Sequence, residues 1–241
     1  MALTWGMDTV ERVGRVTLTA SGRPWPWADG NRDAIARHWQ IASAANPDFF
    51  NGVIHLIDAI ATDPDHVRAR LLRTDFQSYL YWRDEGFPKA AGVLDGFGSA
   101  LIRSSEGQII LGRQRTGNIN SGLAYPPGGF IDARDASLGG AIDIAASVAR
   151  EVREETGLED RDLHAEAGFL VTRAGAHVSF AVPYRSTRSA SALKACIEGH
   201  IAADPNPELA EVVIVRRASD MDGLAMPHFA RVLLTQVFKD R

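Results

Sequence analysis

The chain has 241 residues, of which 45% are hydrophobic and 23% are charged, and its formal net charge at pH 7 is -4. This length and composition are typical of an ordinary globular protein and exclude a disordered or fibrous chain. The small negative charge provides no general attraction for nucleic acid or an anionic membrane surface. We therefore expect no nucleic-acid partner and no membrane partner, and a local site for any phosphate ligand.

The cysteine count and the first residues of the chain favour the cytoplasm. Cys196 is the single cysteine, so it has no partner for an internal disulfide. Residues 1–6 lack the basic and long apolar regions of a signal peptide, and no stretch reaches the ~20 apolar residues that span a bilayer. We predict a cytoplasmic protein, and the sequence leaves its oligomeric state open.

Residues 1–89 are predicted to form a small α/β module. The expected elements are a strand over residues 10–20, a loop over 21–26, a helix over 33–44 capped by Asn31, strands over 52–60 and 66–73, and a helix that Thr74 caps and that runs to Trp82. Most aromatic side chains of this module should be core, although Trp25 and Trp27 in the predicted loop could stack on a nucleobase.

Residues 90–241 are predicted to form a second, larger α/β domain. The expected elements are a hairpin of strands over 98–103 and 108–113, a loop over 125–129, a helix from the Asp143 cap to Thr156 with Gly157 at its end, paired strands over 163–172 and 177–184, a helix, a strand over 211–216 and a closing helix over 227–238. Most of the candidate chemistry lies on the helix that Asp143 caps.

That helix carries a ridge of three carboxylates. At ~100° per residue, Glu151 and Glu155 lie on nearly one line and Glu154 lies beside them, bordering an apolar stripe. Such a charge run by itself is most often a solvated helix face with ion pairs, here to Arg150 and Arg153. Clustered carboxylates nevertheless repel one another, and Mg²⁺ is the ion most commonly bound by a few carboxylates together with substrate phosphates.

The segment Arg150-Glu151-Val152-Arg153-Glu154-Glu155-Thr156-Gly157-Leu158 resembles the second half of the Nudix box. The resemblance covers roughly residues 90–241 and implies an α/β/α sandwich with a mixed sheet. It also implies hydrolysis of a nucleoside diphosphate linked to another group, with Mg²⁺ as the cofactor and Mn²⁺ as the alternative ion. By this likeness Glu151, Glu154 and Glu155 bind the metal, Glu154 directly or through water, and Arg150 orients them.

The first half of the box departs from the family pattern. If Gly129 is the box glycine, Arg150 should follow 14 positions later but follows 21 positions later, so about seven residues are inserted. Counted back from Arg150, the first box glutamate falls on Ile142, which cannot bind a metal. The carboxylates considered as replacements are Asp132, Asp135 and Asp143, although Asp143 is more simply the helix cap.

Further candidates lie outside the acidic helix. Glu208 and Glu198 are the two candidates for a general base, and Glu208 is included with Arg150 and Glu154 among the predicted catalytic residues. Gly129, with Gly128, could bring the backbone to the metal or phosphate, or could simply form a turn. Arg113 and Arg115 could bind phosphate, but strand-end arginines are usually only solvated.

The substrate is less well defined than the chemistry. Short motifs of the N-terminal module, Asn51-Gly52, Arg73-Thr74-Asp75-Phe76 and Tyr81-Trp82-Arg83, are similar to those of eukaryotic Nudix enzymes that hydrolyse UDP-sugars. We therefore predict a small-molecule nucleotide substrate, either a nucleoside-diphosphate sugar or ADP-ribose, cleaved to a nucleoside monophosphate and a phosphorylated product. The alternative, motivated by Ile142 and the inserted loop, is a catalytically weak Nudix-like nucleotide sensor or interaction module.

Overall fold

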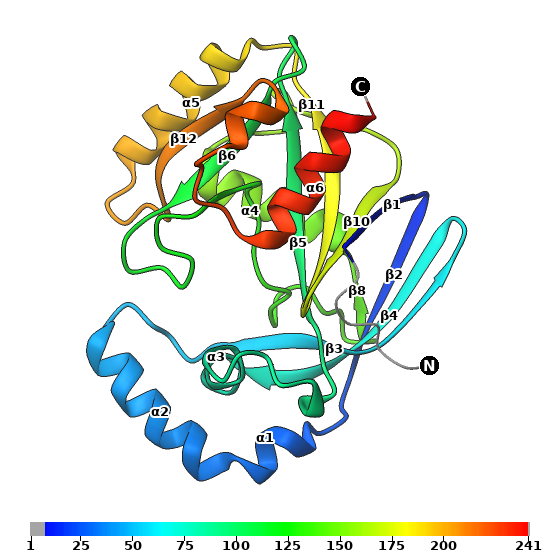
Figure 1. Ribbon diagram of the computed structural model, residues 1–241, viewed down its shortest axis with the longest axis vertical. Coiled ribbons are helices and arrows are strands. Elements are labelled where there is room, and N and C mark those ends of the chain that lie inside the picture. Colours follow the sequence, from blue (N-terminus) through cyan, green and yellow to red (C-terminus); the bar gives the residue numbers. More distant parts are fainter. Residues whose placement is uncertain (1–7, 241) are drawn as a thin grey trace.

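Figure 1 shows the computed structural model, which describes residues 8–240; the prediction about a signal peptide concerns residues 1–6 and lies outside the described residues. Over residues 8–240 the strands form an eight-stranded sheet and a four-stranded sheet. The larger sheet runs β1 (Thr9–Val13), β10 (Phe169–Ala174), β11 (His177–Arg185), β5 (Asp95–Arg103), β6 (Ile109–Gln114) and β12 (Leu209–Val215), with β7 (Ala124–Tyr125) beside β6 and β9 (His164–Ala165) beside β11.

The larger sheet is mixed, because β5 and β11 are parallel and their other neighbours are antiparallel. Helices cover both faces: α4 (Ile144–Thr156) and α5 (Ala190–Ala203) pack on one face, and α6 (His228–Lys239) packs on the other (Figure 1). Successive residues of β5 serve opposite faces, so Ile102 packs with α4 and α5 whereas Leu101 packs with α6. This arrangement confirms the predicted α/β/α sandwich with a mixed sheet.

The smaller sheet belongs mostly to the N-terminal part of the chain. It runs β3 (Val53–Asp63), β4 (His66–Asp75), β2 (Arg15–Ser21) and β8 (Ala141–Ile142). The remaining helices are α1 (Pro26–Gly30), α2 (Arg32–Ala45), α3 (Phe76–Asp84) and the short 3-10 helices η1 (Lys89–Ala91) and η2 (Ala218–Met221). In Figure 1, α1 and α2 lie below the smaller sheet, on the side away from the larger one. Trp82 is completely buried in the core that joins α3 to the smaller sheet.

The single strand predicted over residues 10–20 is wrong, because the segment forms two strands in two sheets. β1 pairs with β10 of the larger sheet, whereas β2 pairs with β4 and β8 of the smaller one. Gly14 lies between them, and a Cβ atom there would come within 2.5 Å of the Asp65 carboxylate. Alternating apolar residues indicate that a segment forms a strand, but they do not indicate which sheet the strand joins. The predicted division at residue 90 stays a prediction, and both β1 and β8 pair across it.

Two local predictions for the N-terminal module, both of helix caps, are also wrong, and the predicted loop is found but ends one residue early. The predicted loop ends in a helix, α1, because the fixed φ of Pro26 suits a first helical position. Asn31 precedes α2 without capping it, since its side chain donates to the Trp27 carbonyl oxygen (2.7 Å). Asp75, not Thr74, caps α3 by accepting the backbone N–H three residues later (3.1 Å).

From residue 90 onward the predicted elements are confirmed with one change. The hairpin β5–β6, helix α4, strand β12 and helix α6 occur close to the expected positions. The strand predicted over 163–172 begins only at Phe169, because Gly168 before it has a φ of 79°, which interrupts an extended backbone. The residues further upstream form β9, which pairs with the other end of β11. No helix within residues 8–240 is long and apolar enough to cross a membrane.

Candidate active site

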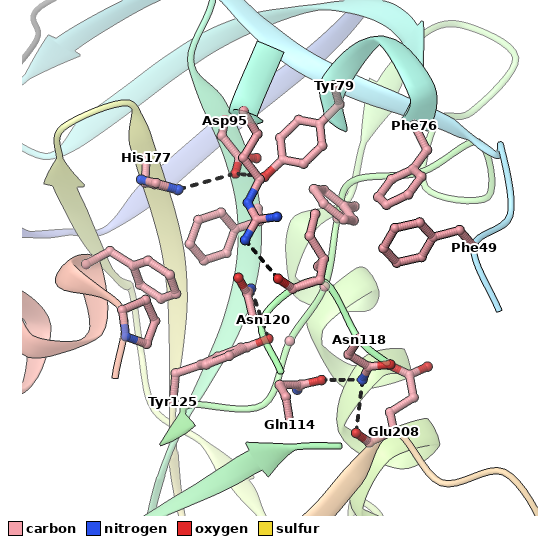
Figure 2. A pocket seen from close by; sticks show the side chains of 18 of the residues that line it. Phe49, Phe76, Tyr79, Asp95, Gln114, Asn118, Asn120, Tyr125, His177 and Glu208 are labelled. Atoms are coloured by element: carbon pink, nitrogen blue, oxygen red, sulfur yellow. Dashed lines mark hydrogen bonds and ion pairs between the residues drawn. The ribbon is translucent and has the colours of Figure 1, made fainter. Parts of the chain in front are cut away.

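A cavity of about 420 Å³ lies between the N-terminal part of the chain and the larger sheet. Helix α3 contributes Phe76, Tyr79 and Arg83 to its wall, the segment between α2 and β3 contributes residues 48–50, and strands and loops of the larger sheet form most of the rest. Figure 2 shows part of this wall. Three predicted site residues line this cavity: Gly129, Glu155 on α4 and Glu208 just before β12. The acidic helix therefore meets a space that can hold a ligand.

Signals in its own sequence define and orient α4. The Asp143 carboxylate accepts a backbone N–H of the first turn (3.0 Å), and Gly157 ends the helix with a φ of 67°. Val152 packs into the core beneath the larger sheet, which fixes the rotation of the helix. On the same helix, Glu151 and Glu155 are buried. The predicted cap, end and acidic ridge of this helix therefore occur where the sequence placed them.

Glu155 is a buried carboxylate at the cavity wall, with only 4% of its surface exposed. Its Oε2 accepts the backbone N–H of Gly128 (3.2 Å) from the proline- and glycine-rich loop. Burial raises its pKa well above the ordinary value, and the negative charges of Glu208 and Glu151 raise it further. A cation bound here would favour the ionised carboxylate.

Glu151 lies one turn before Glu155, and burial raises its pKa to about 7. The positive charge of Arg150 opposes this shift, whereas Glu154 adds to it. Arg150 donates to the Glu151 carboxylate (2.6 Å). A Cβ atom on Gly129 would come within 2.5 Å of Glu151 Oε2, so only glycine lets the loop approach so closely. The predicted site residue Gly129 therefore contacts the predicted ligand Glu151.

Glu154 lies on the outer side of the ridge, with 44% of its side chain exposed. It accepts hydrogen bonds from Arg150 (3.2 Å) and from Arg134 of the inserted loop (3.3 Å). The structure thus places Glu154 in an ion-pair network rather than on the cavity wall formed by Glu155. Its predicted roles as a metal ligand and catalytic residue stay predictions.

Arg150 is held in place by a carboxylate of the inserted loop. Its Nη2 donates to Asp135 (2.9 Å), whose side chain is 3% exposed and also accepts the backbone N–H of Asp132 (2.8 Å). Burial would lower the pKa of Arg150, but the Asp135 hydrogen bond and the charges of Glu151 and Asp135 raise it on balance. The arginine is therefore firmly charged and fixed beside Glu151.

Ile142, which occupies the position of the first glutamate of the Nudix box, has a structural role. Ile142 is 7% exposed and packs in the core where β8 pairs with β2. Asp143 caps α4, and Asp132 is paired chiefly with Arg134 (2.6 Å), lying 3.8 Å from Arg150. Of the three carboxylates considered as replacements, Asp135 is the one that makes the direct hydrogen bond to Arg150.

The two candidate bases lie in different surroundings. Glu208 lines the cavity; burial raises its pKa, Glu154 raises it further and Arg115 lowers it. Glu198 lies on α5, where it pairs with Lys194 (2.8 Å). The structure therefore brings Glu208, and not Glu198, to the cavity with Glu155.

The model of one protein family, the NUDIX domain, matches residues 95–228 of the chain, which is more than half of its length. The chain belongs to the Nudix family. It is accordingly a pyrophosphohydrolase, and its reaction belongs to the broad class in which a nucleoside diphosphate linked to another group is hydrolysed. No curated protein matches the sequence.

Solved Nudix structures resemble the chain at low sequence identity. RenU, a Nudix hydrolase from M. smegmatis, is 15% identical and has a TM-score of 0.41, with 61% of this chain and 84% of that chain covered. MutT from Methanosarcina mazei Go1 is 20% identical with a TM-score of 0.41, covering 61% and 94%. The NUDIX domain of Shewanella oneidensis NrtR, solved with ADP ribose, is 17% identical with a TM-score of 0.41, covering 67% and 97%.

A second NrtR structure bears on the predicted partners. That structure, of Shewanella oneidensis NrtR with a 27mer DNA, is 18% identical to this Nudix chain and has a TM-score of 0.38, covering 60% of each chain. The prediction that the present chain binds no nucleic acid stays a prediction.

The carboxylates of this Nudix enzyme fit a hard divalent cation by their chemistry. Burial and mutual repulsion raise the pKa of Glu151, Glu155 and Glu208, as expected for acids whose charge a cation would neutralise. Residues 8–240 contain no group of three His, Cys, Asp or Glu side chains already arranged as a metal site. Mg²⁺ is usually held by one or two carboxylates, with waters and substrate phosphates completing its shell, so Glu151 and Glu155 suffice.

Other candidates from the sequence have structural partners instead. Arg113 donates to Glu211 (2.6 Å) across the β6–β12 pair, and Arg115 donates to Asn206 (2.7 Å). Trp25 is 4% exposed in the N-terminal core. These contacts favour packing and ion-pair roles over phosphate or nucleobase binding.

Sequence reasoning missed the opposite end of the cavity. Asp95 at the start of β5 is 3% exposed, and burial raises its pKa. The Tyr79 hydroxyl donates to its Oδ2 (2.9 Å), and His177 Nε2 lies 3.7 Å from the same oxygen (Figure 2). These residues are far apart in the sequence and meet only through tertiary packing, so a lone Asp before a strand gave no signal.

Proposed function

We propose that this Nudix enzyme is a Mg²⁺-dependent hydrolase of nucleoside-diphosphate sugars or ADP-ribose, releasing a nucleoside monophosphate and a phosphorylated product. One observation carries the proposal: Glu155 is a buried carboxylate on the wall of a 420 Å³ cavity, and its strongest electrostatic neighbours are the acids Glu208 and Glu151. A bound cation would neutralise these acids in place of protons, and a cation on a cavity wall can bind the phosphates of a ligand.

The chain's own residues would divide the work of the reaction. The metal, when bound, neutralises charge on the phosphate oxygens and lowers the pKa of a water. Glu151 and Glu155 hold it, and Arg150, fixed by Asp135, keeps Glu151 in place. Glu208, whose pKa burial raises, is a stronger base than an exposed glutamate and would accept the proton of a water.

The cavity suits a nucleotide with a second group attached. Ligand sites for small molecules have volumes of ~300–1,000 Å³ and combine aromatic walls with a few polar groups. Here Phe76 and Tyr79 of α3 and Phe130 from the loop after Gly129 supply aromatic surface, and polar groups lie at both ends. Because α3 forms one wall, the N-terminal module is part of the proposed substrate site.

A substrate panel tests the proposal. Purified protein would be incubated with UDP-glucose, ADP-ribose, a dinucleoside polyphosphate and nucleoside triphosphates, each with Mg²⁺, with Mn²⁺ and with a chelator. We expect metal-dependent release of a nucleoside monophosphate from an NDP-sugar or ADP-ribose. Product from none of the substrates would overturn the proposal, and tight nucleotide binding without turnover would instead indicate the sensor alternative.

A further inference from the structure

One carboxylate oxygen of Asp95, a residue that lines the cavity, has no hydrogen-bond partner among residues 8–240. Asp95 lines the cavity, and its two carboxylate oxygens differ (Figure 2). Oδ2 accepts the Tyr79 hydroxyl (2.9 Å) and lies 3.7 Å from His177, whereas Oδ1 is buried and has no hydrogen-bond partner among residues 8–240. A buried acceptor without a partner is costly, so a hydrogen-bond donor is expected from a ligand.

The surroundings of Asp95 favour a flat ring as that ligand. Around His177 the rings of Phe87, Phe97 and Phe229 have centroids at 5.0, 6.4 and 5.7 Å, and all of these residues line the cavity. Aromatic walls stack well on a planar base. A sugar would bury several hydroxyl groups against these rings without partners, which is unfavourable.

Arg83 adds a cationic donor to the wall of the same cavity. It lies on α3, lines the cavity, and donates through Nη2 to the carbonyl oxygen of Ile119 (2.8 Å). Its positive charge acts on Asp95, and a guanidinium has five N–H donors, so donors remain for a ligand. A carboxylate acceptor and a cationic donor on the wall of one cavity are complementary to a ring N–H next to a carbonyl group.

We propose that Asp95 and Arg83 bind the edge of a nucleobase that presents a ring N–H beside a carbonyl, as uracil and guanine do. Adenine and cytosine present an unprotonated ring nitrogen at this edge, and its lone pair would repel the carboxylate. This inference rests on the proposed function and deepens it. It assigns selection of the base to a carboxylate of the larger sheet and an arginine of the N-terminal module.

Binding of reaction products tests this without any turnover. Calorimetric titrations with UMP, GMP, CMP and AMP in Mg²⁺ would be compared with 3-methyl-UMP and 1-methyl-GMP, in which the ring N–H is blocked. We expect UMP or GMP to bind ~10- to 100-fold more tightly than its methylated form, as for a hydrogen bond to a charged group. The UMP and GMP titrations show which base is preferred. Equal binding of methylated and unmethylated forms, or tighter binding of CMP or AMP, overturns the proposal.

Variants assign the effect to Asp95. In D95N, the Tyr79 hydroxyl would still donate to the side-chain oxygen of residue 95 and the NH₂ group would face the ligand, so the ratio of unmethylated to methylated affinities should fall to about 1. D48N, at a lining residue whose side chain is 66% exposed, removes the same charge and should keep the ratio of the unaltered protein. A D95N protein that still binds the unmethylated nucleotide more tightly than the methylated one contradicts the assignment to Asp95. If D95N does not fold, the comparison of methylated and unmethylated nucleotides with the unaltered protein still tests the proposal.

The two proposals fail in different ways. Hydrolysis of nucleoside-diphosphate sugars with no dependence on the base N–H leaves the proposed function standing and removes the base assignment. Base-dependent binding without hydrolysis of any panel substrate does the reverse.

Discussion

The two halves of the Nudix box in this chain are built in different ways. The second half, residues 150–157, lies on one helix, where the predicted carboxylates, cap and terminal glycine all occur in local sequence order. The first half, residues 129–143, is lengthened and includes β8, which pairs with β2 near the start of the chain. Asp135 in this half accepts a hydrogen bond from Arg150, although it does not lie at the sequence distance from Arg150 that the family pattern gives to the glutamate.

In this chain a carboxylate partner of Arg150 comes from the inserted loop rather than from the position that the family pattern gives to a glutamate. In the family pattern a glutamate occupies the position of Ile142, but here that position belongs to the core between the two sheets. Asp135 supplies a carboxylate to Arg150 from the inserted loop. The insertion therefore serves two purposes, since it joins the box to the N-terminal sheet and provides the arginine with an acidic partner.

The largest expected effect tests the second half of the box. We expect E155Q to lower kcat by ~10³-fold or more, because a buried metal ligand contributes several kcal/mol of charge stabilisation. The matched variant E154Q alters a half-exposed ion pair and should lower kcat by no more than about tenfold. Steady-state kinetics on the best panel substrate measure both. Equal losses in the two variants would show that the burial difference between these glutamates has no functional meaning.

The first half is tested by restoring the family residue. I142E should lower the free energy of unfolding by roughly 3 kcal/mol or more, because it buries a charge in an apolar core, and should not raise kcat. I142V, which keeps the apolar contact, should cost about 1 kcal/mol. Denaturant unfolding together with kinetics gives both quantities. A stable I142E enzyme with increased activity would contradict the core role of this position.

A smaller effect is expected at the carboxylate that holds Arg150. D135N should lower kcat and weaken Mg²⁺ binding by ~10- to 100-fold, the usual cost of losing a residue that orients a metal site. D132N is the control, because Asp132 lies 3.8 Å from Arg150 and is bound mainly by Arg134; we expect a change of about threefold or less. Titration with Mg²⁺ is a readout independent of turnover. If D132N proves the more damaging change, Asp135 does not have the assigned role.

The contrast also explains what the sequence could predict. Helix α4 and its carboxylates follow from local signals, namely the Asp143 cap, the apolar stripe and Gly157, and all were placed correctly. Two features could not be predicted, namely the change of sheet at Gly14 and the contact between Asp135 and Arg150. Both depend on which distant segments of the chain pair with each other, and the spacing of residues in the sequence does not indicate that. The choice of substrate stays a prediction, and so do the roles of the predicted site residues, namely Gly129, Arg150, Glu151, Glu154, Glu155 and Glu208.

The smallest expected effect is a pH dependence of stability that a cation removes. Burial raises the pKa of Glu151 to about 7 from an ordinary value of 4.5. Between these values the folded protein keeps a proton that the unfolded chain has lost, so unfolding releases a proton and stability falls as pH rises. The loss should begin near pH 4.5, level off above about pH 7 and amount to a few kcal/mol at most.

Scanning calorimetry of the metal-stripped protein from about pH 5 to about pH 8 measures this slope. E151Q has no titrating group at this position and should give a flatter profile, while the raised pKa values of Glu155 and Glu208 keep some slope of the same sign. Mg²⁺ binds the ionised carboxylates, so it should raise the Tm more near pH 8 than near pH 5. A Tm of the stripped protein that climbs with pH, or a Mg²⁺ effect that is largest at low pH, would mean that Glu151 and Glu155 are already neutralised by the protein itself. The acidic half of the box would then be a structural ion-pair network, as its inserted first half is in part.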